Sequence, residues 1–166
     1  MEEVSVFIGR FQPFHLGHLS VLHNLQTKKV YIGIGSSQYH HTLENPFTFD
    51  ERKKMIHLAL SKTDTFTYTV YPIPDIHDPP NWVEHVEHIL PPFTQVLTNN
   101  DFTASLFEEK GYKVIESGLI HREQYRGAEI RKRMIHNQSW DHLVPSIVAT
   151  YLHEIKAVER MQSLKK

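Results

Sequence analysis

Two histidines stand three residues apart beside an arginine, directly after an apolar run. The stretch is GRFQPFHLGHL, and its chemically active side chains are Arg10, His15 and His18. Imidazoles at this spacing can bind a metal ion, move a proton or hold an anion. A zinc site needs further ligands, and metalloprotease helices place their histidines four apart with a glutamate between, which is absent here. The pair alone fits a structural or surface role as well.

The elements on either side decide what this stretch can do. Val4–Gly9 predicts a buried strand, and a leucine stripe predicts a helix over 17–26. Arg10 then lies in the loop at the carboxyl end of the strand, while His15 and His18 share one face of the first helical turn. Unpaired N–H groups at a helix N-terminus, together with a guanidinium fork, suit an anion. The arrangement therefore favours a polyphosphate site.

Strand and helix signals alternate along the rest of the chain. Further strands are predicted over 30–36, 68–73, 95–98 and 112–115, and further helices over 48–62, 81–89, 101–109, around 130–135, and 145–163. Thr48 and Glu51 form a capping box. This order predicts an α/β fold, a Rossmann-like, doubly wound, parallel five-stranded sheet with helices on both faces. We expect a single domain over 1–166, with the C-terminal helix of about 145–163 packed on it.

Composition excludes several functional classes. The chain has 166 residues, a net charge of −1 and no cysteine, which excludes disulfides, thiolate zinc, iron–sulfur clusters and a cysteine nucleophile. The balanced charge gives no reason to expect nucleic acid or a membrane surface as a partner. No apolar run approaches the roughly 20 residues of a membrane span. We expect a cytoplasmic protein.

Strings over nearly the whole chain resemble the archaeal-type nicotinamide-nucleotide adenylyltransferases, a family of the HxGH nucleotidylyltransferase superfamily. GRFQPFHLGH carries the first signature. The other matching strings are GIGSSQ (33–38), NPFTFDER (45–52), IPDI (73–76), WVEH (82–85), PPF (91–93) and YRGAEIRKRM (125–134).

The resemblance implies transfer of AMP from ATP to nicotinamide mononucleotide (NMN), giving NAD and pyrophosphate. The 5′-phosphate of NMN would attack the α-phosphorus of ATP in line. A phosphate monoester with a second pKa of about 6 is mostly deprotonated at pH 7, so no general base is needed. Catalysis then depends on positioning and on charge neutralisation. Magnesium, or another divalent cation, would be held by the phosphates and not by protein side chains.

The resemblance also implies roles for individual residues. His15 and His18 would donate hydrogen bonds to the triphosphate in the transition state, Arg10 would contact phosphate, and Arg131 would hold the β- and γ-phosphates. The remaining residues implied for ATP are Gly9, Phe11 and Arg126.

A second set of residues is implied for NMN. Trp82 would stack on the nicotinamide ring by a cation–π interaction, with a core anchor as the alternative interpretation. Asp75 would bind ribose hydroxyls or assist the cation, and Ser36 and Ser37 would donate to the NMN phosphate. The family resemblance also implies a homo-oligomer, commonly a hexamer.

The sequence departs from the family at two places. Arg126 and Ala128 replace the two hydroxyl residues of the second signature. Glu44 stands where relatives tend to have a basic residue, and we expect it to face away from the phosphates. His40 and His41 either replace that charge when protonated or belong to a mobile polar loop. Elsewhere, His85 and His88 fit an exposed helical face better than a metal pair.

Two other functions remain open from the sequence. An adenylyltransferase or cytidylyltransferase with another phosphorylated acceptor keeps the same chemistry. A nucleotide-binding sensor that has lost catalysis is suggested by Arg126 and Ala128. The sequence does not decide between NMN and nicotinic acid mononucleotide.

Overall fold

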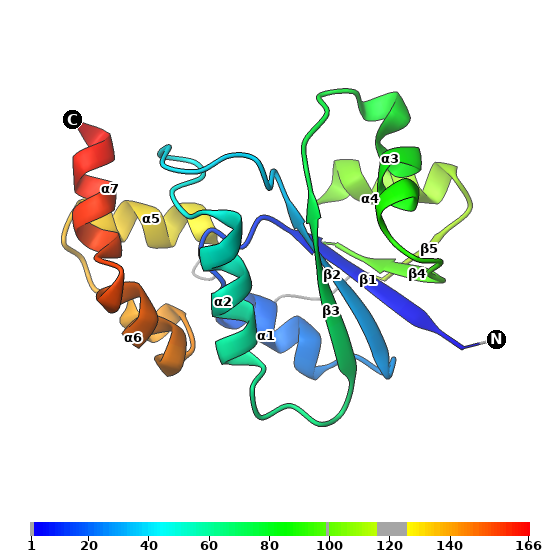
Figure 1. Cartoon of the computed structure of the whole chain (residues 1–166), viewed down its shortest axis with the longest axis horizontal. Helices are drawn as coiled ribbons and strands as arrows, with labels where there is room; N and C mark the ends of the chain where they lie inside the picture. The colour runs from blue at the N-terminus through cyan, green and yellow to red at the C-terminus, as the bar shows by residue number, and fades with distance from the viewer. Residues whose placement is uncertain (1, 99, 116–125) are drawn as a thin grey trace. The chain divides into compact units, whose positions relative to one another are not determined.

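The computed structural model describes residues 2–98, 100–115 and 126–166 (Figure 1). Its strands are β1 (Val4–Gly9), β2 (Lys29–Gly35), β3 (Thr67–Ile73), β4 (Gln95–Leu97) and β5 (Lys113–Ile115). Its α-helices are α1 (Leu16–His23), α2 (Phe49–Ala59), α3 (Trp82–Ile89), α4 (Asp101–Glu109), α5 (Gly127–Ile135), α6 (Ser146–Glu154) and α7 (Ala157–Lys165). Short 3₁₀ turns occupy Pro79–Asn81 and Asp141–Leu143.

All five strands pair in parallel, in the order β3-β2-β1-β4-β5. The predicted α/β class and the five-stranded parallel sheet are confirmed. The chain proceeds from β1 to β3 on one side of the sheet and returns to the other side for β4 and β5. The order therefore reverses between β1 and β4, the position at which doubly wound sheets bind ligands beyond the carboxyl ends of their strands.

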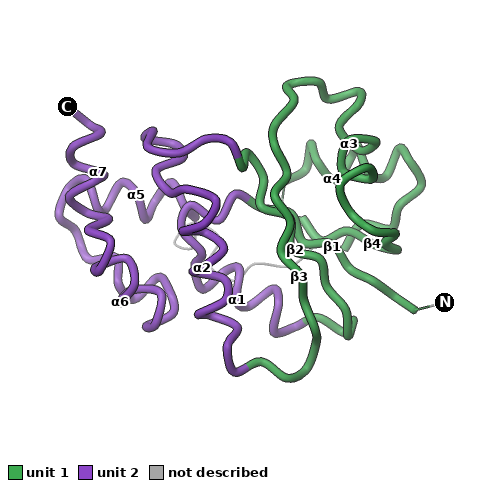
Figure 2. Tube along the Cα trace, in the orientation of Figure 1, with its two compact units in different colours: residues 1–9, 25–37, 63–118 green, residues 10–24, 38–62, 119–166 purple. Residues whose placement is uncertain are grey.

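The contacts within the chain gather into two compact units (Figure 2). Unit 1 comprises residues 1–9, 25–37 and 63–118 and contains the whole sheet with α3 and α4. Unit 2 comprises residues 10–24, 38–62 and 119–166 and contains the other five helices of the described residues. A single domain over 1–166 stays a prediction.

The core of unit 1 lies between the sheet and α3 and α4. Phe107 of α4 is 1% exposed and meets the rings of Phe93 and Trp82 at centroid distances of 6.3 and 6.4 Å. The buried cluster consists of Val4, Val6, Tyr31, Ile73, Val83, Val86, Leu90, Phe93, Val96 and Phe107. This apolar layer fixes the strands whose carboxyl ends carry several of the predicted site residues.

The N-terminal caps of α2 and α4 show how far local sequence predicts a helix start. The capping box of α2 is confirmed, because Thr48 Oγ1 accepts from the N–H of Glu51 and Glu51 Oε1 accepts from the N–H of Thr48. For the helix predicted over 101–109, Asp101 is a good candidate N-cap by residue type. The N-cap of α4 is instead Asn100, whose Oδ1 accepts from the N–H of Thr103. Both residue types cap well, so local sequence does not separate neighbours.

The predicted C-terminal helix of 145–163 is two helices. Lys156 adopts a left-handed conformation with φ of 57°, and this ends α6 and redirects the chain into α7. No glycine or proline marks the break, which is why the apolar period extends across it. Ile147, in the first turn of α6, is 44% exposed. Within unit 2, α6 packs against α2 and α7 packs against α5.

None of the described helices is both long enough and apolar enough to span a membrane.

Candidate active site

His15 and His18 cap helix α1 with each other's side chains. His15 is the N-cap residue, and its Nδ1 accepts a hydrogen bond of 3.3 Å from the main-chain N–H of His18. In return, Nδ1 of His18 accepts a hydrogen bond of 3.1 Å from the N–H of His15. The two rings stack with centroids 3.6 Å apart. The arrangement is a capping box in which histidines replace the usual hydroxyl and carboxylate.

Burial determines the charge of the two rings, and the pairing determines which nitrogen of each ring carries the proton. Burial lowers the pKa of His15 to about 3. Burial, and then repulsion from His15, lowers the pKa of His18 well below 6.5. Both imidazoles are therefore neutral at pH 7, and since each Nδ1 is an acceptor, each proton resides on Nε2. Two neutral rings that present Nε2–H groups fit the predicted role as hydrogen-bond donors.

Aromatic side chains hold the ring of His18 in place. Phe11 and Phe14 are 1% and 0% exposed, and their ring centroids lie 4.7 and 5.3 Å from that of His18. Phe11 has a φ of 54°, a left-handed conformation that is uncommon outside glycine and is often found at functional sites. Phe11 was predicted to contact ATP. Its side chain is buried, so such a contact would have to come from the main chain.

Arg131 of α5 reaches the loop that precedes α1. It is 8% exposed, and its Nη1 donates a hydrogen bond of 2.7 Å to the main-chain oxygen of Gln12. A Cβ atom on Gly127 would lie 2.7 Å from that same Nη1 and 3.0 Å from the Gln12 oxygen. Glycine at the first position of α5 is therefore what lets Arg131 approach the loop.

Gln12 joins the same loop to the segment before α2. Its side-chain amide donates to the main-chain oxygen of Phe47 at 3.1 Å, and its Oε1 accepts from the N–H of Phe47 at 2.9 Å. Gln12 is 3% exposed. The loop that carries Arg10 and His15 is thus fixed from two sides.

The charge of Arg10 acts on two other guanidinium groups of unit 2, and we call Arg10, Arg52 and Arg131 the arginine cluster. Burial and then the charge of Arg10 lower the pKa of both Arg52 and Arg131 to about 10. The side chain of Arg10 is exposed, and its Nη1 lies 3.5 Å from Oδ1 of Asn45. Positive charges that repel one another mark a place where a polyanion would be stabilised.

The two sequence departures lie in the same unit. Arg126 is the N-cap of α5, is exposed and makes no side-chain capping bond. Ala128 is also exposed. Glu44 is exposed and close enough to Arg131 for its charge to raise that residue's pKa against the larger effect of burial. That Glu44 faces away from the phosphates stays a prediction. Tyr125, the first residue of the second signature string, lies outside the described residues.

The residues predicted for NMN belong to unit 1, as does Gly9 at the end of β1. Ser36 and Ser37 directly follow β2, and the N–H of Ser37 donates to the oxygen of Ile73 at 3.3 Å. Asp75 follows β3 and accepts at Oδ1 from the N–H of His77 at 2.9 Å. Because β2 and β3 are parallel neighbours, these side chains follow the same edge of the sheet.

Trp82 begins helix α3 and is half-buried against the core of unit 1. It therefore has the core contact of the alternative interpretation while part of the side chain stays exposed. His85, expected on an exposed face, is half-buried, and its Nε2 lies 2.8 Å from the main-chain oxygen of Pro74. His85 thus ties α3 to the segment that carries Asp75.

Among the residues that the structure describes, no group of three or more His, Asp or Glu side chains could hold a metal ion. The loop before α1 is contacted by the guanidinium groups of Arg131 and Arg52, which are hydrogen-bond donors and suit a phosphate better than a cation. A divalent ion at such a site would take its ligands from the phosphates themselves.

Sequence reasoning missed Gln12 and Arg52. Both are polar residues inside strings that resemble the family, and both are buried, at 3% and 0% exposure. Their presence in GRFQPFHLGH and NPFTFDER was the available signal, but their contacts join segments far apart in the chain.

The comparisons with known proteins agree with this geometry. The family model described as cytidylyltransferase-like matches residues 6–138. A protein of Picrophilus torridus named nicotinamide-nucleotide adenylyltransferase is 44% identical over 162 residues, covering 96% of each chain. A protein of Methanococcus aeolicus with the same name is 45% identical, covering 96% of this chain and 94% of that protein. The chain belongs to the cytidylyltransferase-like family and, within it, to the nicotinamide-nucleotide adenylyltransferases.

A solved structure of a nucleotidyltransferase shows a similar fold. It is a bifunctional NMN adenylyltransferase/ADP ribose pyrophosphatase from Francisella tularensis in complex with AMP and a manganese ion, 26% identical with a TM-score of 0.77. The match covers 99% of this chain and 52% of that chain. This chain thus spans about half the length of the bifunctional protein.

Proposed function

We propose that this protein is a nicotinamide-nucleotide adenylyltransferase that transfers AMP from ATP to NMN and releases NAD and pyrophosphate. The observation that carries the proposal is the reciprocal cap of His15 and His18. It leaves two neutral rings protonated at Nε2 in the same unit as the arginine cluster, in a family whose relatives carry this name.

The reaction requires that the triphosphate of ATP is held in a fixed position and that the negative charge on its phosphates is neutralised. An oxygen of the NMN 5′-phosphate forms a bond to the α-phosphorus of ATP, the bond from that phosphorus to the bridging oxygen breaks, and pyrophosphate leaves with the electron pair. In this proposal the Nε2–H groups of His15 and His18 donate to phosphate oxygens as negative charge builds on them. Neutral donors remain fixed throughout, since neither imidazole gains or loses a proton.

Arg10 and Arg131 supply the positive charge for the same substrate. Arg131 is held by Gln12, so its guanidinium requires little reorganisation on binding. The exposed side chain of Arg10 remains free to turn toward the triphosphate. Gly9, Phe11 and Arg126 complete the proposed ATP set through main chain or charge. A divalent cation, magnesium in this proposal, would neutralise charge on the phosphates.

For NMN we assign Trp82 to the nicotinamide ring, Asp75 to ribose hydroxyls, and Ser36 and Ser37 to the phosphate. The exposed part of Trp82 supports the first assignment, and the position of the others after parallel strands supports the rest. A homo-oligomer, a hexamer in the family pattern, and a cytoplasmic location are proposed on resemblance and on the absence of cysteine.

The test is chromatography of products after the protein is mixed with ATP, magnesium and NMN. Parallel reactions contain nicotinic acid mononucleotide or FMN in place of NMN. Equal amounts of NAD and pyrophosphate support the proposal. Binding of ATP without any dinucleotide product would instead indicate the nucleotide-binding sensor.

A further inference from the structure

Arg52 places a charged side chain in the interior of unit 2. It is the fourth residue of α2 and is 0% exposed. Burying a guanidinium is unfavourable unless its N–H groups find acceptors. Its pKa of about 10, lowered first by burial and then by Arg10, leaves it positively charged at pH 7.

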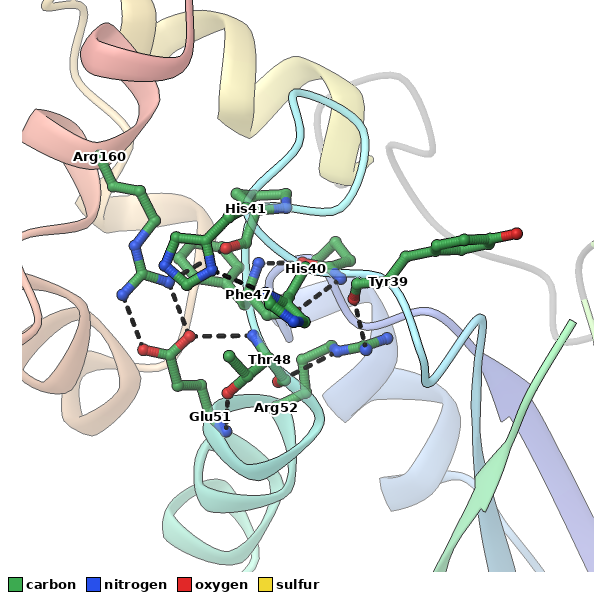
Figure 3. A network of polar contacts seen from close by, with 10 residues as sticks. Tyr39, His40, His41, Phe47, Thr48, Glu51, Arg52 and Arg160 are labelled. Atoms are coloured by element: carbon green, nitrogen blue, oxygen red, sulfur yellow. Dashed lines mark hydrogen bonds and ion pairs between the residues drawn. The ribbon is translucent and has the colours of Figure 1, made fainter.

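Each nitrogen of this guanidinium serves a different segment of the chain. Nε donates to the main-chain oxygen of Thr48 at 3.2 Å, Nη1 to that of Arg10 at 3.1 Å, and Nη2 to that of Tyr39 at 3.3 Å. The bonds to Thr48 and Tyr39 are visible in Figure 3. One planar group thus joins the loop after β1, the loop after β2 and the start of α2.

Of the three acceptors, the main-chain oxygen of Arg10 connects Arg52 to the proposed ATP site. Arg10 lies between the end of β1 and the loop that leads to His15, and its side chain is exposed. A hydrogen bond to its main-chain oxygen fixes the backbone of Arg10 and therefore the position of its Cα, from which the side chain extends. The same bond brings a second positive charge next to Arg10, which is unfavourable without an anion.

We propose that Arg52 is a positioning residue for the ATP site: its three-way contact fixes the main chain of Arg10, and its charge adds to the field that attracts the triphosphate. The inference rests on the proposed function. It extends the site to a residue that does not touch substrate and acts through Arg10.

Two substitutions separate the geometry from the charge. Arg52→Lys keeps the charge but has a single nitrogen, which cannot reach three carbonyls in the geometry of a guanidinium. Arg52→Gln removes the charge as well. We expect Arg52→Lys to lower kcat roughly 10- to 100-fold with a small change in KM for ATP, because Arg10 is displaced. In Arg52→Gln we expect a lower kcat and, in addition, a higher KM for ATP. The KM for NMN should be unchanged in both variants.

Arg133→Lys is the matched control. Arg133 also donates to a main-chain oxygen, that of Ser139 at 3.0 Å, but it belongs to a surface pair with Glu129. We expect wild-type kinetics from this variant. A merely structural role for Arg52 would reduce the amount of folded protein, lowering apparent kcat while both KM values stay at their wild-type levels in both variants.

A double-mutant cycle with Arg10→Gln covers the case in which Arg52→Gln folds poorly. If Arg52 acts through Arg10, the effects of Arg10→Gln and Arg52→Lys on kcat/KM for ATP are far from additive. Additive effects, or unchanged kinetics in Arg52→Lys, overturn the inference. If the wild type makes no dinucleotide, the proposed function fails, and ATP affinity measured by calorimetry replaces kcat/KM in the same cycle.

Discussion

The Nδ1 atoms of His15 and His18 each accept a hydrogen bond from the main-chain N–H of the other residue. Both rings are consequently fixed to the helix at Nδ1 and, being neutral, carry their proton on Nε2. The cap that begins α1 and the donors proposed for catalysis are therefore the same two side chains. Formation of this cap therefore also orients both imidazole rings.

The buried pair makes the protein sensitive to acid. The pKa of His15 is about 3 in the folded state against 6.5 when unfolded, so below pH 6.5 the unfolded chain binds the additional proton. Its contribution to stability is complete above pH 6.5 and falls by about 1.4 kcal/mol per pH unit as the pH drops toward 3. His15→Asn keeps a capping side chain without titrating. We expect urea unfolding at pH 7, 6, 5 and 4 to give a shallower pH slope for this variant.

The control for that series is His23→Asn, an exposed histidine at the end of the same helix. It should leave the slope as it is in the wild type. An equal slope for His15→Asn and wild type would contradict the neutral, buried state of His15.

The capping box of α2 and the end of α4 show what local sequence can predict. Thr48 and Glu51 bond within one helical turn, and Gly111, with a φ of 89°, ends α4 at the expected place. The break at Lys156 shows the limit, because a lysine in a left-handed conformation leaves no local signal. Tertiary packing of α7 against α5 favours the turn there.

Gly127→Ala should weaken the ATP site. The new Cβ would lie 2.7 Å from Arg131 Nη1 and 3.0 Å from the Gln12 oxygen, so the guanidinium must leave its acceptor. We expect the KM for ATP to rise roughly 10-fold, the usual cost of losing one charged hydrogen bond, with KM for NMN unchanged. Steady-state kinetics measure both.

Gly111→Ala is the contrasting glycine substitution. Apart from its chain neighbours, none of the described residues has an atom within 4 Å of its added Cβ, but its φ of 89° strains any side chain. It should cost about 1 kcal/mol of stability and leave both KM values as in the wild type. A Gly127→Ala enzyme with wild-type ATP kinetics would show that Arg131 does not need its contact with Gln12.

Arg160→Met should destabilise unit 2. Arg160 of α7 binds both carboxylate oxygens of Glu51 at 2.6 and 2.8 Å (Figure 3). It also donates to the main-chain oxygen of Pro46 at 3.0 Å. Burial alone would raise the pKa of Glu51, but the bonds from Arg160 and Thr48 outweigh it and lower the pKa. We expect a loss of about 2 kcal/mol in urea unfolding at pH 7.

The lowered pKa of Glu51 determines how the stability loss in Arg160→Met changes with pH. Its stabilisation is present above the ordinary value of 4.5 and is lost as the pH falls through the folded-state value. The difference between Arg160→Met and wild type should therefore shrink below pH 4.5. Arg133→Met, which breaks the surface pair with Glu129, should cost less than about 0.5 kcal/mol. Equal losses in the two variants would contradict this interpretation.

Trp82→Leu should affect NMN and leave ATP unaffected. Leucine keeps apolar packing against the core of unit 1 but offers no aromatic face to a pyridinium. A desolvated cation–π contact of about 1–2 kcal/mol corresponds to a KM for NMN raised about 5- to 30-fold. Trp140→Leu, at a tryptophan that is 4% exposed in unit 2, should reduce stability without changing that KM. An unchanged KM for NMN in Trp82→Leu would leave Trp82 as a core anchor only.

The candidate site divides into residues that sequence patterns identify and residues that only packing identifies. Sequence motifs identify four residues with functional side chains: Arg10, His15, His18 and Arg131. Gln12 and Arg52 act through main-chain contacts 35 and 42 residues away, so no spacing in the sequence encodes their partners. Burial of these two polar side chains becomes visible only when the loops are folded together.

The most direct test of the central claim is the amount of NAD and pyrophosphate formed by His18→Ala and wild type from ATP, magnesium and NMN. We expect equimolar NAD and pyrophosphate from the wild type. In His18→Ala we expect turnover reduced about 100-fold, the typical cost of one lost transition-state donor, with NMN binding retained. A wild type that binds ATP but forms no dinucleotide, or a His18→Ala variant with wild-type turnover, would contradict the account.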